Sequence, residues 1–215
     1  MEAPANTIRT NDSDPLDNST GTSASIVTFE ATRITIDSPH DFVTTRARFD
    51  DLVPAFDQLV AVELILRNSE WSEVEDAIAG LVGPEGFMAL SRLDHGALMS
   101  LRAQPIEATQ YLVGNPVIAS RMVSVDTKAA LYAPFTVAIH ADELGTHVSY
   151  TTPSSLLGSL GSPDIYEVAA DLDRRIDITI QKACGDAQTT SVHLTGTAGS
   201  GPALSGKHPD ELRYR

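Results

Sequence analysis

The pair Asp94-His95 stands where a strand-like apolar run ends, and Gly96 follows it. A carboxylate beside an imidazole can orient the ring as a general base or as a metal ligand. The same residues are also typical of a plain turn, in which the Asp accepts backbone N–H groups. A metal site needs three or four ligands, and we cannot assemble them, because His140 and His147 belong to a separate segment. We expect no metal and no cofactor, and keep Asp94 and His95 as candidates for ligand binding or acid–base chemistry.

The second candidate, Gly114-Asn115-Pro116, joins the strand-like run YLV to the helix-like run VIASRM. Gly114 can take a backbone angle closed to other residues. Asn115 can cap a helix, and Pro116 suits its first position. The junction is therefore architectural, but free N–H groups at the helix start could also bind an anion or a polar ligand group. The two roles are compatible, and both stay open here.

Hydroxyl groups offer a third kind of chemistry. Tyr111 and Tyr150 could present hydroxyls to a cleft, although aromatic residues on a sheet face are usually core. Ser154 and Ser155 lack a G-x-S-x-G context, so helix capping is their expected role. The sequence contains no P-loop, no G-x-G-x-x-G and no H-E-x-x-H. Tyr150 joins the candidate ligand-binding residues, and the question of an enzyme stays open.

Composition narrows the classes of partner. The 215 residues are 42% hydrophobic and carry a formal net charge of −14. That charge repels phosphate backbones and anionic lipid, so we expect neither nucleic acid nor a membrane as partner. One cysteine, Cys184, allows no intramolecular disulfide, and no run of about 18 apolar residues occurs. The N-terminus does not have the pattern of a secretory signal. A cytoplasmic location is the simplest expectation.

The elements that position these residues follow from periodicity. Polar, aperiodic composition predicts a flexible N-terminal arm over residues 1–22 and a flexible C-terminal tail over 186–215, with a single domain over 23–185. Pro54 is expected near a helix start and Gly83 just past a helix end. The predicted elements are a strand over 26–38, helices over 50–62 and 69–83, strands over 86–94 and 106–114, a short helix over 116–126, a hairpin around DELG and a long final helix.

The long final helix is the best defined. Ser162 can cap it, Pro163 suits its first position and Gly185 can end it. Its apolar stripe leaves Asp173 on the outer face and consists of Ile165, Val168, Ala169, Leu172, Ile176, Ile180 and Ala183. About 20 residues span about 30 Å, enough to cross a four- or five-stranded sheet. The predicted fold class is α+β, with helices packed on one face of a mainly antiparallel sheet.

Several segments taken together carry a family likeness: FMALSRLDHG, YLVGNPVIASRM, LYAPFTVAIH, VSYTTPSSLLGSLG and VAADLDRRID. Over roughly residues 25–184 the chain resembles the bacterial domain-of-unknown-function 302 family, in its longer form. The resemblance implies a TATA-binding-protein-like arrangement, β-α-β(4)-α, which agrees with the element order above. It implies no reaction, and a shared fold does not by itself make the chain a DNA binder.

The sequence favours an uncharacterised soluble bacterial domain that binds a small molecule between the sheet and the C-terminal helix. His95, Asn115 and Tyr150 are the polar groups expected at the rim of that pocket. One alternative is an enzyme with Asp94 and His95 as its acid–base pair. The other is a structural homo-oligomer, such as a homodimer, that binds no ligand and uses the exposed sheet face or edge as its interface.

Overall fold

The computed structural model describes residues 24–102 and 105–185. The predicted N-terminal arm, 1–22, and C-terminal tail, 186–215, lie outside these residues. The described elements are β1 (Arg33–Ser38), α1 (Phe42–Leu52), α2 (Gln58–Leu66), α3 (Trp71–Ala79), β2 (Met88–Asp94), α4 (His95–Ser100), β3 (Ala108–Gly114), α5 (Pro116–Val123), η1 (Thr127–Leu131), β4 (Phe135–Asp142), β5 (Gly145–Thr151), α6 (Pro153–Leu157), η2 (Gly158–Leu160) and α7 (Pro163–Cys184).

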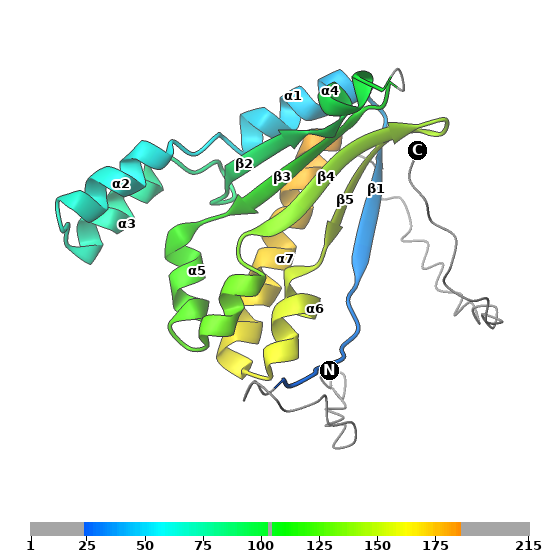
Figure 1. Ribbon diagram of the computed structural model, residues 1–215. Coiled ribbons are helices and arrows are strands. Elements are labelled where there is room, and N and C mark those ends of the chain that lie inside the picture. Colours follow the sequence, from blue (N-terminus) through cyan, green and yellow to red (C-terminus); the bar gives the residue numbers. More distant parts are fainter. Residues whose placement is uncertain (1–23, 103–104, 186–215) are drawn as a thin grey trace, which may run out of the picture.

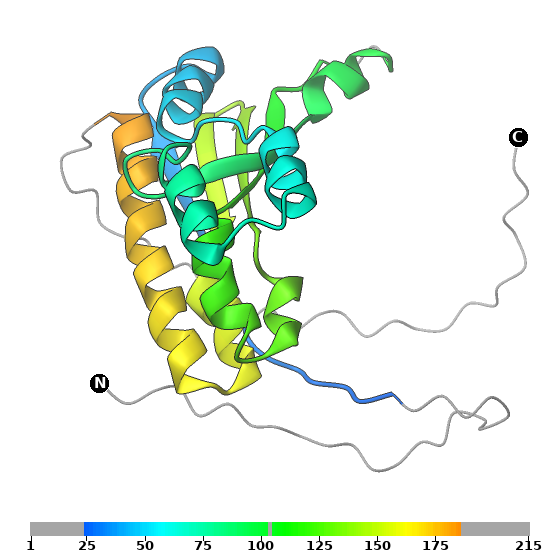
Figure 2. The same ribbon diagram turned by 90° about the vertical axis from the view of Figure 1, so that its left-hand side faces the viewer.

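The five strands form one antiparallel sheet in the order β1-β5-β4-β3-β2. Helices α1 and α7 cover one face of this sheet, and α4 lies on the other side (Figures 1 and 2). The predicted α+β class and the order of one strand, helices, four strands and a final helix are confirmed. None of the described helices is both long and apolar enough to span a bilayer.

The sheet alternates between an apolar inner face and a polar outer face, as strand geometry requires. Two cross-strand rows face the helices: Ile34, Tyr150, Val137 and Tyr111, then Ile36, Val148, Ile139 and Thr109. On the outer face, the hydroxyls of Thr35 and Ser149 pair across β1 and β5 at 2.8 Å. The core therefore lies between the sheet and α7.

Helix α7 begins and ends as predicted, and its whole predicted stripe is buried. The Ser162 hydroxyl accepts from the Ile165 N–H, and Gly185 follows the last turn with φ 78°. Arg48 of α1 donates to the carbonyls of Ala183 and Lys182 at 2.8 and 2.9 Å. These bonds help to satisfy the carbonyls at the negative end of the helix, where that of Lys182 also accepts from the Gly185 N–H.

The outward placement of Asp173 was wrong. This carboxylate is half-buried and accepts from the backbone N–H of Ser154 at 3.0 Å, so it holds the start of α6. Burial raises the pKa of Asp173 and outweighs the opposite effect of the Ser154 hydrogen bond.

The N-terminal half differs from the predicted pattern. The first strand begins at Arg33, and α1 was not predicted before its last three residues. The helix predicted over 50–62 is really the end of α1, an interruption and the start of α2. Pro54 lies in the interruption, where its carbonyl accepts from the Ala89 N–H and the Ala89 carbonyl accepts from Phe56, both at 2.9 Å. A tertiary pairing with β2 therefore replaces the helix start expected there.

Candidate functional site

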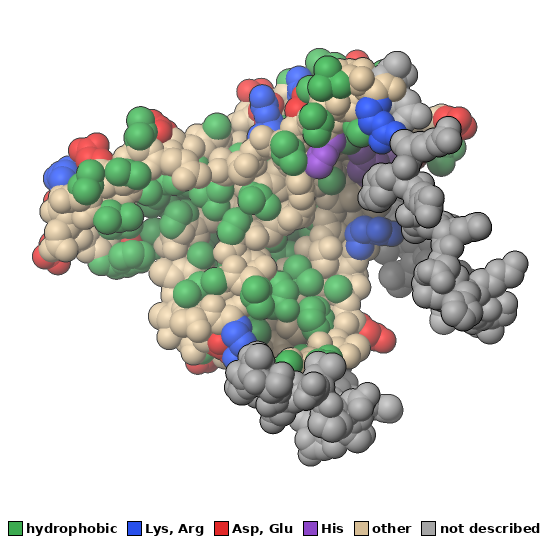
Figure 3. Space-filling view, in the orientation of Figure 1, with side chains coloured by type: hydrophobic (Ala, Val, Ile, Leu, Met, Phe, Trp, Pro, Cys, Tyr) green, Lys and Arg blue, Asp and Glu red, His purple; other side chains and the backbone are tan. Residues whose placement is uncertain are grey.

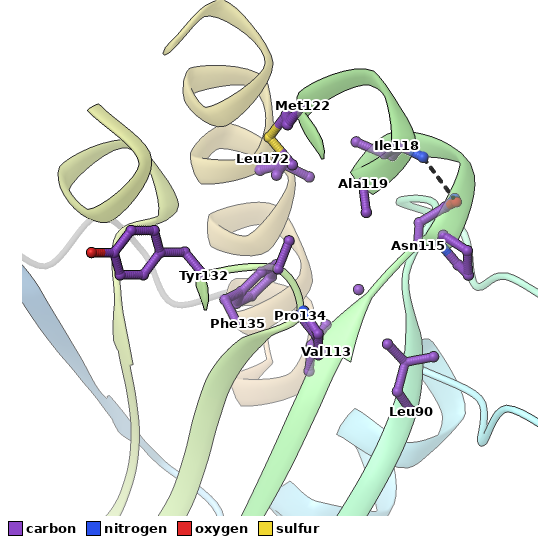
Figure 4. Close-up of a pocket in the computed structure, with 13 residues that line it drawn as sticks. Leu90, Val113, Asn115, Ile118, Ala119, Met122, Tyr132, Pro134, Phe135 and Leu172 are labelled. Carbon is purple, nitrogen blue, oxygen red and sulfur yellow. Dashed lines mark hydrogen bonds between the residues drawn. The ribbon is translucent and has the colours of Figure 1, made fainter. Parts of the chain in front are cut away.

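A cavity of about 180 Å³ lies where the start of β2, the end of β3 and the start of β4 meet α5 and α7 (Figure 4). Asn115 is its one residue with an amide side chain, and Leu172 contributes from the long helix. The lining residues are Leu90, Val113, Gly114, Asn115, Pro116, Ile118, Ala119, Met122, Tyr132, Ala133, Pro134, Phe135 and Leu172. The cavity is therefore apolar and partly open to solvent, and both the sheet and the C-terminal helix contribute to its walls.

Asn115 uses its amide group to build the junction. Its side-chain oxygen accepts from the N–H groups of Val117 and Ile118 at 2.9 and 3.3 Å, and its nitrogen donates to the Gly86 carbonyl at 2.9 Å. Pro116, at the first helical position, has no N–H. The donors at the start of α5 are thus already occupied, which argues against the anion site left open above.

Gly114 has a different role from the one expected. Its φ is not positive, unlike that of four other described glycines. A Cβ at this position would lie 3.3 Å from the Pro134 ring and 3.4 Å from the Leu90 side chain. The glycine therefore allows close packing at the wall of the cavity rather than an unusual backbone angle.

Asp94 and His95 begin a short helix instead of a plain turn. The Asp94 carboxylate accepts from the Ala97 N–H at 2.9 Å and lies 3.8 Å from the Arg46 guanidinium. The ring of His95 lies 3.4 Å from the Gln110 side-chain oxygen. The Asp94 carboxylate therefore caps the helix and pairs with Arg46. The His95 imidazole lies against the outer face of the sheet.

The structure does not bring all the candidate residues together. Asp94 pairs with Thr109 at the start of β3, whereas Gly114 at its end pairs with Met88. These ends are roughly 17 Å apart at about 3.4 Å per residue. Gly114, Asn115 and Pro116 line the cavity, and Asp94 and His95 lie at the far end of the sheet.

Both candidate tyrosines are in the core. Tyr150 is buried on the inner face and does not line the cavity, and burial together with the charges of Asp177 and Asp173 raises its pKa. Tyr111 is fully buried and donates to Asp50 at 2.8 Å. Burial and that carboxylate raise the pKa of Tyr111 as well. Both tyrosines therefore belong to the core, as expected for aromatic residues on a sheet face.

A histidine–carboxylate cluster was missed by the sequence interpretation. His147 is 8% exposed, and its Nδ1 lies 2.7 Å from Asp37 of β1 while its Nε2 lies 3.1 Å from Asp142 at the end of β4. His140 packs beside it, with ring centroids 5.3 Å apart, and bonds the Ser149 hydroxyl. Pairing of the predicted hairpin around DELG places the two histidines opposite each other, but only the pairing of β1 supplies Asp37.

Two carboxylates favour the doubly protonated form of His147, because both ring nitrogens then donate. Burial acts against that charge, but the hydrogen bonds and charges of Asp142 and Asp37 outweigh it and raise the pKa of His147. Burial and the neighbouring His147 lower the pKa of His140. No group of three or more His, Cys, Asp or Glu side chains in the described ranges is placed to hold a metal ion.

The stability contributed by His147 is expected to depend on pH. Because its folded-state pKa lies above the ordinary value of about 6.5, the contribution is complete below that pH and is lost as the pH rises through the folded-state pKa. In a His140→Gln background, which removes the neighbouring titration, His147→Gln should cost more at about pH 5.5 than at about pH 9. Urea titrations at the two pH values measure this difference. Equal losses of stability at the two pH values would contradict a protonated His147 that bridges Asp37 and Asp142.

Fold and cavity together define an α+β domain with a five-stranded antiparallel sheet, one covered face and an apolar cavity at one end of its core. The chain belongs to the family described as domain of unknown function DUF302, whose model matches residues 64–183. The family predicted from the sequence is thus confirmed.

A solved structure with the same fold is the crystal structure of the uncharacterized conserved protein DUF302 from Bacillus stearothermophilus. It is 16% identical to this chain, with a TM-score of 0.51, and the match covers 70% of this chain and 97% of that chain. At this identity the likeness shows the fold. A comparison with curated proteins found no match.

Proposed function

We propose that the protein is a binding module that takes a small apolar molecule in the cavity beside α5. The observation that carries the proposal is a space of about 180 Å³ with apolar walls from the sheet, α5 and α7. An apolar cavity of about 150 Å³ is enough to bind benzene. The space is partly open to solvent at one end of the core, and concave apolar sites of this kind are where small molecules commonly bind.

The chemistry of the lining selects the class of ligand. The polar atoms of Asn115 are engaged by Val117, Ile118 and Gly86, so they are not available to a polar ligand without loss of the helix cap. In Figure 4 the hydroxyl of Tyr132 points away from the cavity. The ligand should therefore be an uncharged molecule of about ten non-hydrogen atoms or fewer, held by apolar contact.

Binding is favoured over catalysis by the same lining. Among the described residues that line the cavity, none carries a carboxylate, imidazole, thiol or amine side chain. General acid–base chemistry needs such a group, or a phenol, within hydrogen-bond reach of the reacting atoms, and the hydroxyl of Tyr132 points away from the cavity. The pair Asp94 and His95, the basis of the enzyme hypothesis, lies at the other end of β2.

A cavity-filling variant tests the proposal. Ala119 projects into the cavity in Figure 4, so Ala119→Leu should occupy part of the space. Toluene is the probe, titrated into labelled protein and followed by amide chemical shifts. We expect wild type to bind with Kd below about 1 mM and the variant at least about tenfold more weakly.

Ala130→Leu is the matched control, because it makes the same change at an exposed position outside the cavity. It should bind toluene as wild type does. The melting temperature of Ala119→Leu separates a filled cavity from a damaged fold, since filling a void stabilises a protein. Absence of saturable shifts with toluene and with indole in wild type would refute the proposal, and so would unchanged binding in Ala119→Leu.

A further inference from the structure

Helix α2 is apolar on nearly all sides, yet none of its nine residues is buried. Its sequence, QLVAVELIL, has two polar side chains, Gln58 and Glu63. Leu59, Ile65 and Leu66 are 72%, 76% and 81% exposed. Helices that are apolar all round are normally buried in a core or an interface. Figure 3 shows hydrophobic side chains gathered on the projecting helical hairpin formed by α2 and α3.

The α2–α3 hairpin is held firmly at its base. Two backbone hydrogen bonds of 2.9 Å join Pro54 and Phe56 to Ala89, and the Gln58 amide donates to the Leu90 carbonyl at 3.2 Å. From this base the hairpin projects away from the sheet (Figure 1). Its apolar side chains are therefore presented on a fixed support, so a partner need not order them on binding.

We propose that a second copy of this chain covers α2, with the two α2 helices packed against each other across a two-fold axis. Val62 and Trp71, each 50% exposed, extend the surface formed by the three residues above. Five such side chains present on the order of 500 Å² of apolar surface. Because about 60% of a typical interface is apolar, this corresponds to roughly 800 Å² per partner, the size of a stable interface.

Charge disfavours an anionic membrane as the occupant, and it leaves α2 as a surface on which a second copy meets little repulsion. The chain carries −14, so copies repel each other over most of their surface. On α2, however, Glu63 pairs with Arg67 at 3.5 Å, so the N-cap Asp57 is the one charge of the helix and its caps that this pair does not offset. Interfacial membrane helices have a basic polar face, whereas α3 and its cap carry Glu70, Glu73, Glu75 and Asp76 and no basic residue. Two-fold pairing of the α2 helices places their apolar side chains together.

Sedimentation velocity between about 1 and about 100 µM tests the proposal on the full chain. We expect a wild-type dimer with Kd below about 10 µM. Leu66→Glu should raise that Kd at least about a hundredfold, because two-fold symmetry buries the new charge twice. Leu59→Glu, near the other end of α2, should act in the same direction. Circular dichroism should match wild type for both variants, and so should melting measured below the wild-type Kd, since neither side chain is buried in the monomer.

Leu131→Glu is the control, because Leu131 is 74% exposed on η1 and lies outside α2. It should leave the dimer intact. A wild type that stays monomeric at about 100 µM would overturn the proposal. In that case, flotation with neutral phosphatidylcholine vesicles would show whether lipid covers α2 instead. A dimer that survives Leu66→Glu would place the interface elsewhere and also refute the proposal.

Discussion

Ile176→Ala is expected to lower the free energy of unfolding by about 2–5 kcal/mol. Ile176 is fully buried near the middle of α7, in the stripe that packs against the inner face of the sheet. Truncation removes three carbon atoms from the core and leaves a space that the strands cannot close, because their cross-strand pairing fixes their positions. Urea denaturation with a constant m-value measures the loss.

The control for this prediction is Glu167→Ala, an exposed position on the same helix, expected to change stability by under about 0.5 kcal/mol. Asp173→Ala is unsuitable, although periodicity places Asp173 on the outer face. It would leave the Ser154 N–H without its partner and should destabilise α6. Equal losses for Ile176→Ala and Glu167→Ala would show that the inner face of α7 has been assigned wrongly.

Helix α7 could be predicted in full because each of its signals is local. Ser162, Pro163 and Gly185 mark its ends, and seven apolar residues at helical spacing mark its inner face. Asp173 departs from this pattern for a tertiary reason, since the N–H that it accepts comes from α6. Periodicity says which way a side chain points, but not whether another element covers it.

Helix α1 could not be predicted in the same way. Its buried residues are Phe42, Thr45 and Phe49, and one of the three is a threonine. The stripe is therefore too weak to separate the helix from the segment that follows, although Asp41 does cap it by accepting from Thr44. The bridge of Pro54 and Phe56 to β2 joins segments more than thirty residues apart and has no local signal.

In the candidate site, too, the features with local signals could be predicted and those that depend on tertiary contacts could not. The capping role of Asn115 and the helix-starting role of Pro116 followed from the sequence, because both act within one turn. The cavity that they border also needs Leu90, Tyr132 and Leu172, which come from three other parts of the chain. The His147 cluster similarly depends on the pairing of β1 with β5. Sites built by strand pairing become visible only once the register is known.

Gly83 has a different structural role from the one that the sequence pattern predicted. The sequence pattern placed it just past the end of a helix, but α3 ends at Ala79 and Gly80 is its cap. Gly83 instead packs against the end of α1, where a Cβ would overlap the carbonyl oxygen of Leu52 and lie 3.2 Å from the Pro54 ring. The glycine is needed because two backbones meet at the base of the α2–α3 hairpin.

Gly83→Ala is therefore expected to cost about 3 kcal/mol or more, since the obstacle is a backbone carbonyl that no rotamer change can move. Relief of the overlap requires a shift of the chain that also strains the 2.8 Å hydrogen bond from the Gly83 N–H to the Phe87 carbonyl. Urea denaturation measures the cost, and hydrogen exchange of the Phe56 and Ala89 amides reports whether the hairpin base opens.

The matched control is Gly80→Ala, the same change three residues earlier. A Cβ there meets nothing closer than 3.7 Å, and Gly80 has an ordinary φ of −77°. This variant should be neutral or stabilise the protein by up to about 1 kcal/mol, because alanine restricts the unfolded chain more than glycine does. If Gly83→Ala were as harmless as Gly80→Ala, the close approach of the two backbones would be wrong. The α2–α3 hairpin would then lack the fixed base from which it presents its apolar surface.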